Sequence, residues 1–206
     1  NNTAVGKSAM HTNTTGANNT GVGFQSLYSA TTADDNTAIG HNALFNNTTG
    51  ALNTAVGKSA LENNTTASSN QAFGRRALYL NTTGTENNAF GYLAMDANTE
   101  GSYNVAMGVN ALGQNTTADY NTAVGTAALG ANTTGGDNTA VGAFALDANT
   151  TASNNTAVGY FALSASTTAA QNTMVGNNSG DAITTGSNNT GVGYEALGKL
   201  TTGGDN

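Results

Sequence analysis

The sequence predicts an all-β fold, a parallel β-solenoid or β-roll of 12 stacked 17-residue coils. Three observations lead to this prediction: one repeat fills the chain without insertion or deletion, charge is confined to a few repeat positions, and no helical pattern is present. We number each copy 1 to 17 from its leading asparagine and treat residues 1–206 as one array. The copies begin at Asn2, Asn19, Asn36, Asn53, Asn70, Asn87, Asn104, Asn121, Asn138, Asn155, Asn172 and Asn189.

Several repeat positions are invariant or nearly so. Position 1 is Asn, position 5 is Gly and position 13 is Thr in all 12 copies. Position 4 is always large and apolar, and position 9 is Leu or Met except at Gly180. Position 8 is Ala or Ser, and position 15 is Gly or Ala. We therefore expect each position to keep the same environment in every coil.

The charged residues separate the inside from the outside. All five Lys and Arg residues fall at positions 6, 7 or 11, and all 12 Asp and Glu residues at positions 7, 10, 14, 16 or 17. Burying an unpaired charge is costly. Positions 1 to 5, 8, 9, 12 and 13 never carry charge and are therefore expected to form the interior or an interface.

The apolar residues of the repeat favour strands over a helix. A helix would need an apolar stripe at i, i+3, i+4 and i+7, which the fixed Gly and the Asn-Thr-Thr run interrupt. We predict two short strands in each copy, Thr-Ala-Val at positions 2 to 4 and x-Ala-Leu at 7 to 9. Neighbouring strand residues face opposite ways, so positions 3 and 4 should point to opposite sides, as should 8 and 9.

The constant repeat length predicts stacking of each residue above its equivalent. One inserted residue would turn a strand to its other face. Twelve coils at about 4.8 Å each would give a rod roughly 60 Å long. In the eleventh copy Met174 is large where Ala is usual and Gly180 is small where Leu is usual, which places positions 3 and 9 side by side. Neither end carries an atypical capping copy, so we expect uncapped ends that associate end to end.

Stacking also predicts side-chain ladders. Asparagine side chains above one another can bond from coil to coil, and the invariant Thr at position 13 can form a similar row. The structural ladder is expected at position 1, with Asn2, Asn19, Asn36, Asn53, Asn104 and Asn121 among its members.

Composition and motifs exclude several classes of function. Only 8% of residues are charged, the net charge is −7, and Pro and Cys are absent. An acidic chain of this kind does not suit nucleic acid, and no stretch approaches the ~20 apolar residues of a membrane span. His11 and His41 lie at different repeat positions, and no catalytic, metal-binding or cofactor-binding motif is present. We expect a protein that is not an enzyme and needs no cofactor.

The repeat resembles two groups of fibrous proteins. Asn-Thr-Ala-Val-Gly-x-x-Ala-Leu followed by Asn-Thr-Thr-Gly resembles, over the whole chain, the repeats of tail fibre domain proteins of bacteria and bacteriophages. Positions 1 to 8 are similar to the Ser-Val-Ala-Ile-Gly-x-x-Ser core of trimeric autotransporter adhesin heads, whose coils are shorter. These resemblances imply an extracellular location, a β-roll that is often a homotrimer, and a structural role in a secreted, cell-surface or virion fibre.

Three alternatives to a purely structural role remain open. Aromatic residues at the charge-tolerant positions 6 and 10 could bind a cell-surface or glycan receptor, as in an adhesin; they are Phe24, Tyr28, Tyr92, Tyr160 and Tyr194. Asparagines before Thr-Thr could carry glycans, or could instead be ladder or turn residues; they are Asn13, Asn47, Asn64, Asn81, Asn115, Asn132 and Asn149. The paired Thr rows at positions 13 and 14 could bind ice.

Overall fold

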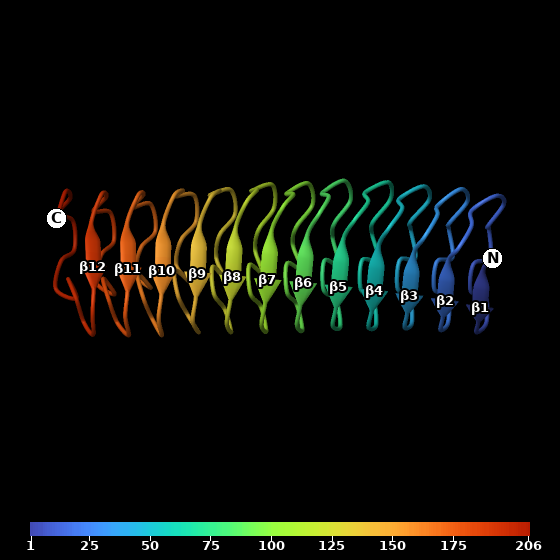
Figure 1. Ribbon diagram of the computed structural model, residues 1–206, viewed down its shortest axis with the longest axis horizontal. Coiled ribbons are helices and arrows are strands. Elements are labelled where there is room, and N and C mark those ends of the chain that lie inside the picture. The colour runs from blue at the N-terminus through green and yellow to red at the C-terminus, as the bar shows by residue number, and fades with distance from the viewer.

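The computed structural model describes all 206 residues as a parallel β-solenoid with one strand in each coil (Figure 1). Twelve strands form a single sheet in sequence order, from β1 to β12, and there is no helix. The predicted fold class is confirmed. The strands are β1 Thr3–Val5, β2 Thr20–Val22, β3 Thr37–Ile39, β4 Thr54–Val56, β5 Gln71–Phe73, β6 Asn88–Phe90, β7 Val105–Met107, β8 Thr122–Val124, β9 Thr139–Val141, β10 Thr156–Val158, β11 Thr173–Val175 and β12 Thr190–Val192.

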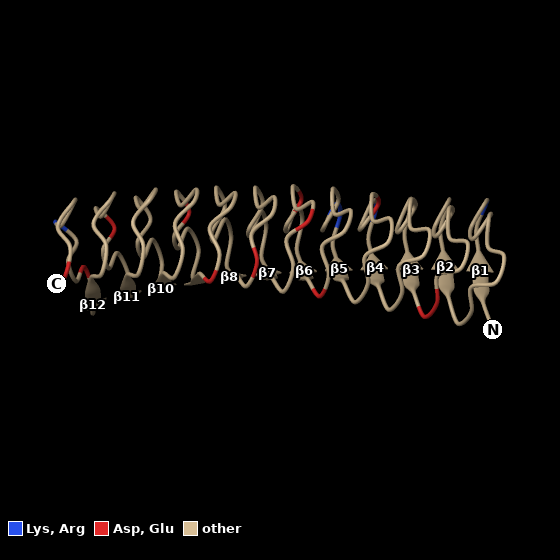
Figure 2. Ribbon diagram, turned by 90° about the horizontal axis from the view of Figure 1, so that it is seen from above, with Lys and Arg blue, Asp and Glu red and all other residues tan.

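The strands pair in strict register with the repeat. Thr122 lies beside Thr139 and Val124 beside Val141, and the same 17-residue offset holds at all the other junctions. Seen from above, the strands lie along one side of the rod and the charged residues lie in the loops (Figure 2). Each coil therefore uses positions 2 to 4 as its only regular strand.

The prediction of a second strand at positions 7 to 9 is wrong. This segment is a series of turns in which positions 7 and 9 adopt positive φ, for example Ala127 at 54° and Leu129 at 51°. Its N–H groups still bond between coils: Ala127 donates to Val109 in the coil before, and Leu129 donates to Ala145 in the coil after. Only 22 of 134 backbone hydrogen bonds lie within strands, so turns hold most of the coil together.

The core is narrow and is built from small residues around one larger side chain. In a typical coil Ala123, Ala128 and Leu129, at positions 3, 8 and 9, are fully buried. Positions 8 and 9 thus both point inward, against the prediction, because the left-handed conformation at position 9 breaks the strand alternation. The predicted contact between positions 3 and 9 is confirmed, since a Cβ on Gly180 would lie 2.9 Å from Met174.

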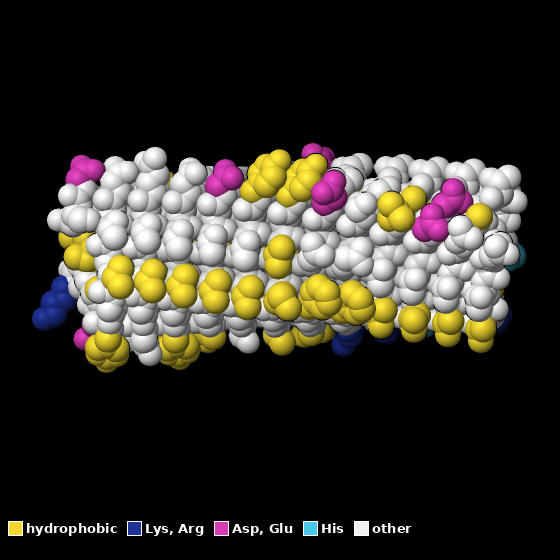
Figure 3. Space-filling model, viewed as in Figure 1, with side chains coloured by type: hydrophobic (Ala, Val, Ile, Leu, Met, Phe, Trp, Pro, Cys, Tyr) yellow, Lys and Arg dark blue, Asp and Glu magenta, His cyan; other side chains and the backbone are white.

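Position 4 does not belong to the core. Strand alternation directs Ala at position 3 inward, so the large apolar residue at position 4 points outward, as predicted for this pair. Val5 is 57% exposed, Ile39 42% and Met107 45%. Position 4 thus never carries charge and yet lies outside the core. The position 4 side chains form a continuous row on the outer face of the sheet (Figure 3).

Candidate assembly surfaces

The position 1 asparagines, including all six named as ladder residues, connect successive coils at one corner. In the coil that begins at Asn53, its backbone N–H donates to Asn36 Oδ1 at 3.0 Å, and its Nδ2 donates to the carbonyl of Ala67 at 2.9 Å. The same pattern places Asn19, Asn36, Asn53, Asn104 and Asn121 in the interior, whereas Asn2 is exposed in the first coil. The link between coils thus runs from side chain to backbone, and at several junctions the two amides also bond directly, as from Asn36 Nδ2 to Asn19 Oδ1 at 3.1 Å and from Asn104 Nδ2 to Asn87 Oδ1 at 3.2 Å.

A second asparagine row, at position 12, forms another amide-to-amide ladder. Asn64 Nδ2 donates to Asn47 Oδ1 at 2.9 Å and to the carbonyl of Ala67 at 2.9 Å. The row continues through Asn81, Asn98, Asn115 and Asn132 to Asn149. Position 12 and position 1 therefore share one carbonyl acceptor, at position 15, which fixes the two corners of the coil relative to each other.

The burial of the position 12 asparagines contradicts the hypothesis that they carry glycans. Asn47, Asn64, Asn81, Asn115, Asn132 and Asn149 are fully buried, and their Nδ2 atoms donate hydrogen bonds inside the coil. A glycan on Nδ2 would be incompatible with this packing. Asn13 is half-buried, and its Nδ2 donates to Gly16 at 3.1 Å. The alternative interpretation of these residues, as ladder asparagines, describes their contacts.

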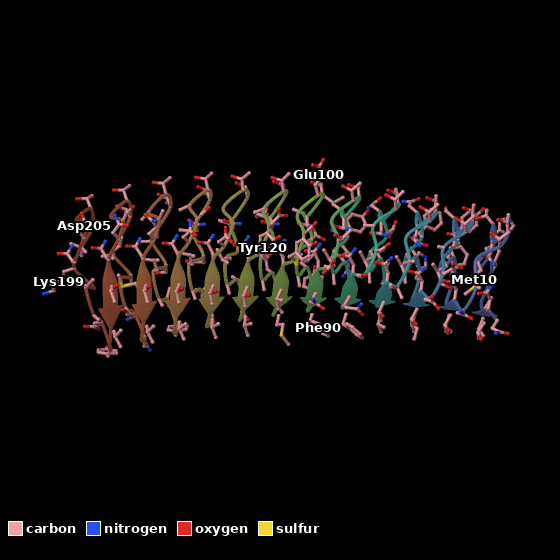
Figure 4. The ribbon with its side chains drawn as sticks, turned by 45° about the horizontal axis from the view of Figure 1, so that its top comes forward. Met10, Phe90, Glu100, Tyr120, Lys199 and Asp205 are labelled. Carbon is pink, nitrogen blue, oxygen red and sulfur yellow. The ribbon has the colours of Figure 1, made fainter.

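The position 13 threonines form a third seam between coils. Thr116 Oγ1 donates to the carbonyl of Thr133 at 3.1 Å, and the backbone N–H of Thr116 donates to the same oxygen at 3.0 Å. Equivalent bonds occur at every junction, from Thr14 to Thr201. The exposed residues beside this seam are those of position 14, which include Glu100 (Figure 4). The two threonine rows proposed for ice binding therefore differ in environment.

Glycine at position 5 is required by two independent features. Gly108 has φ +142°, which side chains rarely adopt, and a Cβ there would lie 2.5 Å from the carbonyl oxygen of Gly125 in the next coil. Gly193, in the last coil, has φ +130°, but no atom lies within 4 Å of the place that a Cβ would occupy. The turn and the close approach of adjacent coils together explain the invariant glycine.

The candidate receptor-binding aromatics lie outside the core in short stacks. Tyr28 stacks between His11 and Phe45, with ring centroids 5.0 and 5.1 Å apart, and Phe24 stacks on His41 at 5.1 Å. His11 and His41 thus lie in different stacks. Tyr92 lies below Arg75 at 5.6 Å, Tyr160 packs edge-on against Phe161 at 4.5 Å, and Tyr194 is 72% exposed. No single groove collects these side chains.

Two carboxylates at position 10 have perturbed acidity. Partial burial raises the pKa of Asp96, and the Arg76 guanidinium, 3.1 Å from Asp96 Oδ1, opposes this shift. Partial burial also raises the pKa of Asp147, against the opposing effect of hydrogen bonds from its own N–H and that of Ala148. His, Cys, Asp and Glu residues form no group of three that could hold a metal ion.

The only hollow in the surface lies at the last coil, among Asp181, Glu195, Leu197, Gly198 and Lys199. No helix is long and apolar enough to cross a membrane. Comparison with family models, curated proteins and solved structures found no match. The candidate functional features are therefore the surfaces of the rod itself: the three hydrogen-bonded seams, the exposed aromatics and the outer face of the sheet.

Proposed function

We propose that this chain is a stiff, non-catalytic structural segment of an extracellular or virion fibre. The single observation that supports the proposal most strongly is the uniform coil. Asparagine and threonine seams recur at 17-residue spacing through the array. Stacking of identical units by nearest-neighbour contacts is the usual construction of solenoid rods. The resemblance to tail fibre repeats favours the same role.

The uniform register between coils supports end-to-end self-association. Every coil pairs with the next in the same 17-residue register, so the strand edge of one coil fits that of any other. Such an edge is a template for another strand. A further coil, from the same chain or from a second copy, would extend the sheet in the same register. Self-association end to end is therefore part of the proposal.

A length series tests the spacer role. Deleting residues 121–188 removes four complete copies and leaves a register-compatible junction. At concentrations where the chains are single rods, small-angle X-ray scattering should then give a rod shorter by about 19 Å, with unchanged cross-section, because each coil adds about 4.8 Å. A change in cross-section, or a length unrelated to copy number, would contradict the proposal.

A receptor-binding head is the second candidate function. The exposed position 6 aromatics support it, since Phe24 is 40% exposed, Tyr92 44% and Tyr160 49%. Aromatic rings present flat apolar faces to which sugars and peptides can bind. Binding to a glycan array that is lost in a Tyr92→Ala and Tyr160→Ala variant would establish this role. Absence of binding by the unmodified protein would leave the structural role alone.

A further inference from the structure

The outer face of the sheet bears a continuous apolar row along the whole rod (Figure 3). We call this row, formed by position 4 of every copy, the apolar stripe; it comprises Val5, Val22, Ile39, Val56, Phe73, Phe90, Met107, Val124, Val141, Val158, Val175 and Val192. The stick view shows Phe90 pointing away from the sheet (Figure 4). Neighbouring Phe73 and Phe90 stack with ring centroids 4.7 Å apart, which leaves no gap at the centre of the row.

The twelve copies provide an internal comparison of positions within one chain. The positions on either side of the strand and its corners vary freely: position 6 holds Lys7, Tyr92, Val109 and Thr126 among others, and position 17 is equally diverse. The stripe is exposed to solvent or half-buried, yet it is apolar in all 12 copies. Packing inside the coil does not explain this restriction, because the inward residue of the strand is position 3. Long exposed apolar patches on soluble proteins generally mark contact surfaces.

The properties of the stripe define what could cover it. It extends over every coil and repeats at the strand spacing, so its partner must offer side chains with the same period over the same length. A second copy of this chain meets these requirements. Positions 2 and 4 of the 12 strands present 24 side chains on this face, which matches the roughly 20–30 residues that a stable interface typically uses on each side.

The charges beside the stripe favour one orientation of the second copy. Along the edge formed by positions 6 and 7, four of the five charged residues are basic: Lys7, Lys58, Arg75 and Arg76, with Glu195 the exception. The opposite edge, at positions 16 and 17, carries only acidic residues: Asp34, Asp35, Glu86, Asp119, Asp137 and Asp205. Figure 3 shows the stripe running between these two edges.

Rotation of one chain by 180° about an axis parallel to the rod turns the outer face of its sheet toward the other chain. The rotation reverses the direction of its strands but keeps the direction of its rod axis. The basic edge of each chain then lies beside the acidic edge of the other, and Arg75 of one copy faces Glu86 of the other within the same fifth repeat. The one like-charged pair is Glu195 and Asp205, in the twelfth repeat. Rods running in opposite directions would instead bring the two acidic edges together, with Glu86 of one copy beside Asp137 of the other, although Lys7 would then face Glu195. Complementary charge fixes orientation in protein interfaces.

We propose that the apolar stripe is a lateral interface, covered by the same face of the sheet of a second copy of this chain whose rod axis runs in the same direction, so that each stripe packs against the position 2 row of the other copy. This inference goes beyond the proposed function, since a single stack of coils would already make a shaft. Two aligned sheets pack about 10 Å apart through such faces. The twofold axis along the rod leaves both ends of each chain free to extend.

A polar variant of the stripe tests the interface. Val124, Val141, Val158 and Val175 are replaced together by Thr, which has a similar shape and strand preference. The control replaces Ala131, Ala148, Ala165 and Ala182, at position 11 of the same four copies, by Thr. Scanning transmission electron microscopy of the full chain should give a mass per unit length of two chains for the unmodified protein and the control. The stripe variant should fall to half this value while its circular dichroism spectrum remains unchanged.

A mass of one chain for the unmodified protein would overturn the proposal, and so would a multimer that persists in the stripe variant. Neither result would affect the length series, which tests the coil alone. If the stripe variant loses its circular dichroism signal, it has failed to fold. The interface is then tested by the mass per unit length of the unmodified protein and by the cross-linking experiment described next.

Cross-linking tests the orientation, and the absence of native cysteine makes it specific. Thr139→Cys and Val141→Cys chains are mixed and treated with a short bis-maleimide reagent. In the proposed arrangement position 2 of one chain faces position 4 of the other within the same copy, so a mixed dimer should form. Cross-linking of Val141→Cys to Val56→Cys instead, which joins the ninth copy to the fourth, would show opposed rods and overturn the arrangement.

Discussion

At the scale of single residues, the buried asparagines determine which side chains each coil can accept. The position 12 ladder is continuous from Asn47 to Asn149 and stops at Ser166. At this point Asn149 Oδ1 and Ser166 Oγ are both buried without a hydrogen-bond partner. A buried polar atom without a partner destabilises a protein by about 1–3 kcal/mol.

Extending the ladder should therefore stabilise the chain. In Ser166→Asn the new Nδ2 can donate to Asn149 Oδ1 and to the carbonyl of Ala169, as asparagines do in the preceding copies. We expect the free energy of unfolding in urea to rise by about 1–2 kcal/mol. Ser166→Ala is the control, since it removes the unpaired hydroxyl without adding a bond. Equal stability of the two variants would contradict this account of the ladder.

The invariant glycine allows backbone strain to be separated from steric clash. Gly108→Ala combines an unfavourable φ with a Cβ 2.5 Å from the Gly125 carbonyl, so it should lower the free energy of unfolding by about 3 kcal/mol or more. Gly193→Ala meets the unfavourable φ alone and should have a clearly smaller effect. Similar losses in the two variants, measured by thermal unfolding, would show that the approach of adjacent coils is not the reason for glycine.

Asp147 predicts an unusual dependence of stability on pH. Its pKa is raised in the folded state by burial above the ordinary value of 3.8, so the folded chain binds this proton more tightly than the unfolded chain. Its contribution to the free energy of unfolding therefore increases as pH falls from neutral through the raised pKa, and is complete below about 3.8. Asp147→Asn should be more stable than the unmodified protein at neutral pH and should lose this pH dependence. Glu100→Gln, at an exposed site, is the control and should change neither property.

At the scale of the coil, the strand and the turns divide the apolar residues between two environments. Leu129 is fully buried, whereas Val124 in the same coil points outward from the sheet. Leu129→Ala should lower the free energy of unfolding by about 2–5 kcal/mol through the cavity that it creates. Val124→Ala should lower it by less than about 1 kcal/mol at concentrations where the chain is a single rod. If Val124→Ala lowered the free energy of unfolding more than Leu129→Ala under these conditions, the assignment of Val124 to the outer face of the sheet would be wrong.

The repeat length and the charge pattern were enough to predict the stacked strands and their register. Charge alone could not separate the outward row at position 4 from the core, because the absence of charge predicts either an interior or an interface. The turns at positions 7 to 9 were missed because Leu rarely adopts positive φ, and only the contacts between coils hold it there. The volume exchange between Met174 and Gly180 identified a true core contact, since tight packing couples neighbouring side chains.

At the scale of the whole molecule, the position 1 asparagines, the position 13 threonines and the strand recur on every coil and make the rod uniform along its length. The Asn and Thr seams and the sheet connect each coil to the next from three directions. Bending the rod would lengthen hydrogen bonds on one side, so stiffness follows from this arrangement. A uniform and stiff segment with a regular outer face suits a fibre shaft.

The axial repeat measured by electron cryomicroscopy tests the central claim most directly, namely that each 17-residue copy forms one coil that rises by one strand spacing. Images of the purified protein should show rods whose Fourier transforms contain a reflection at about 4.8 Å along the rod axis. Rods or compact particles without this axial reflection, or with an axial repeat set by some other number of residues, would contradict the account.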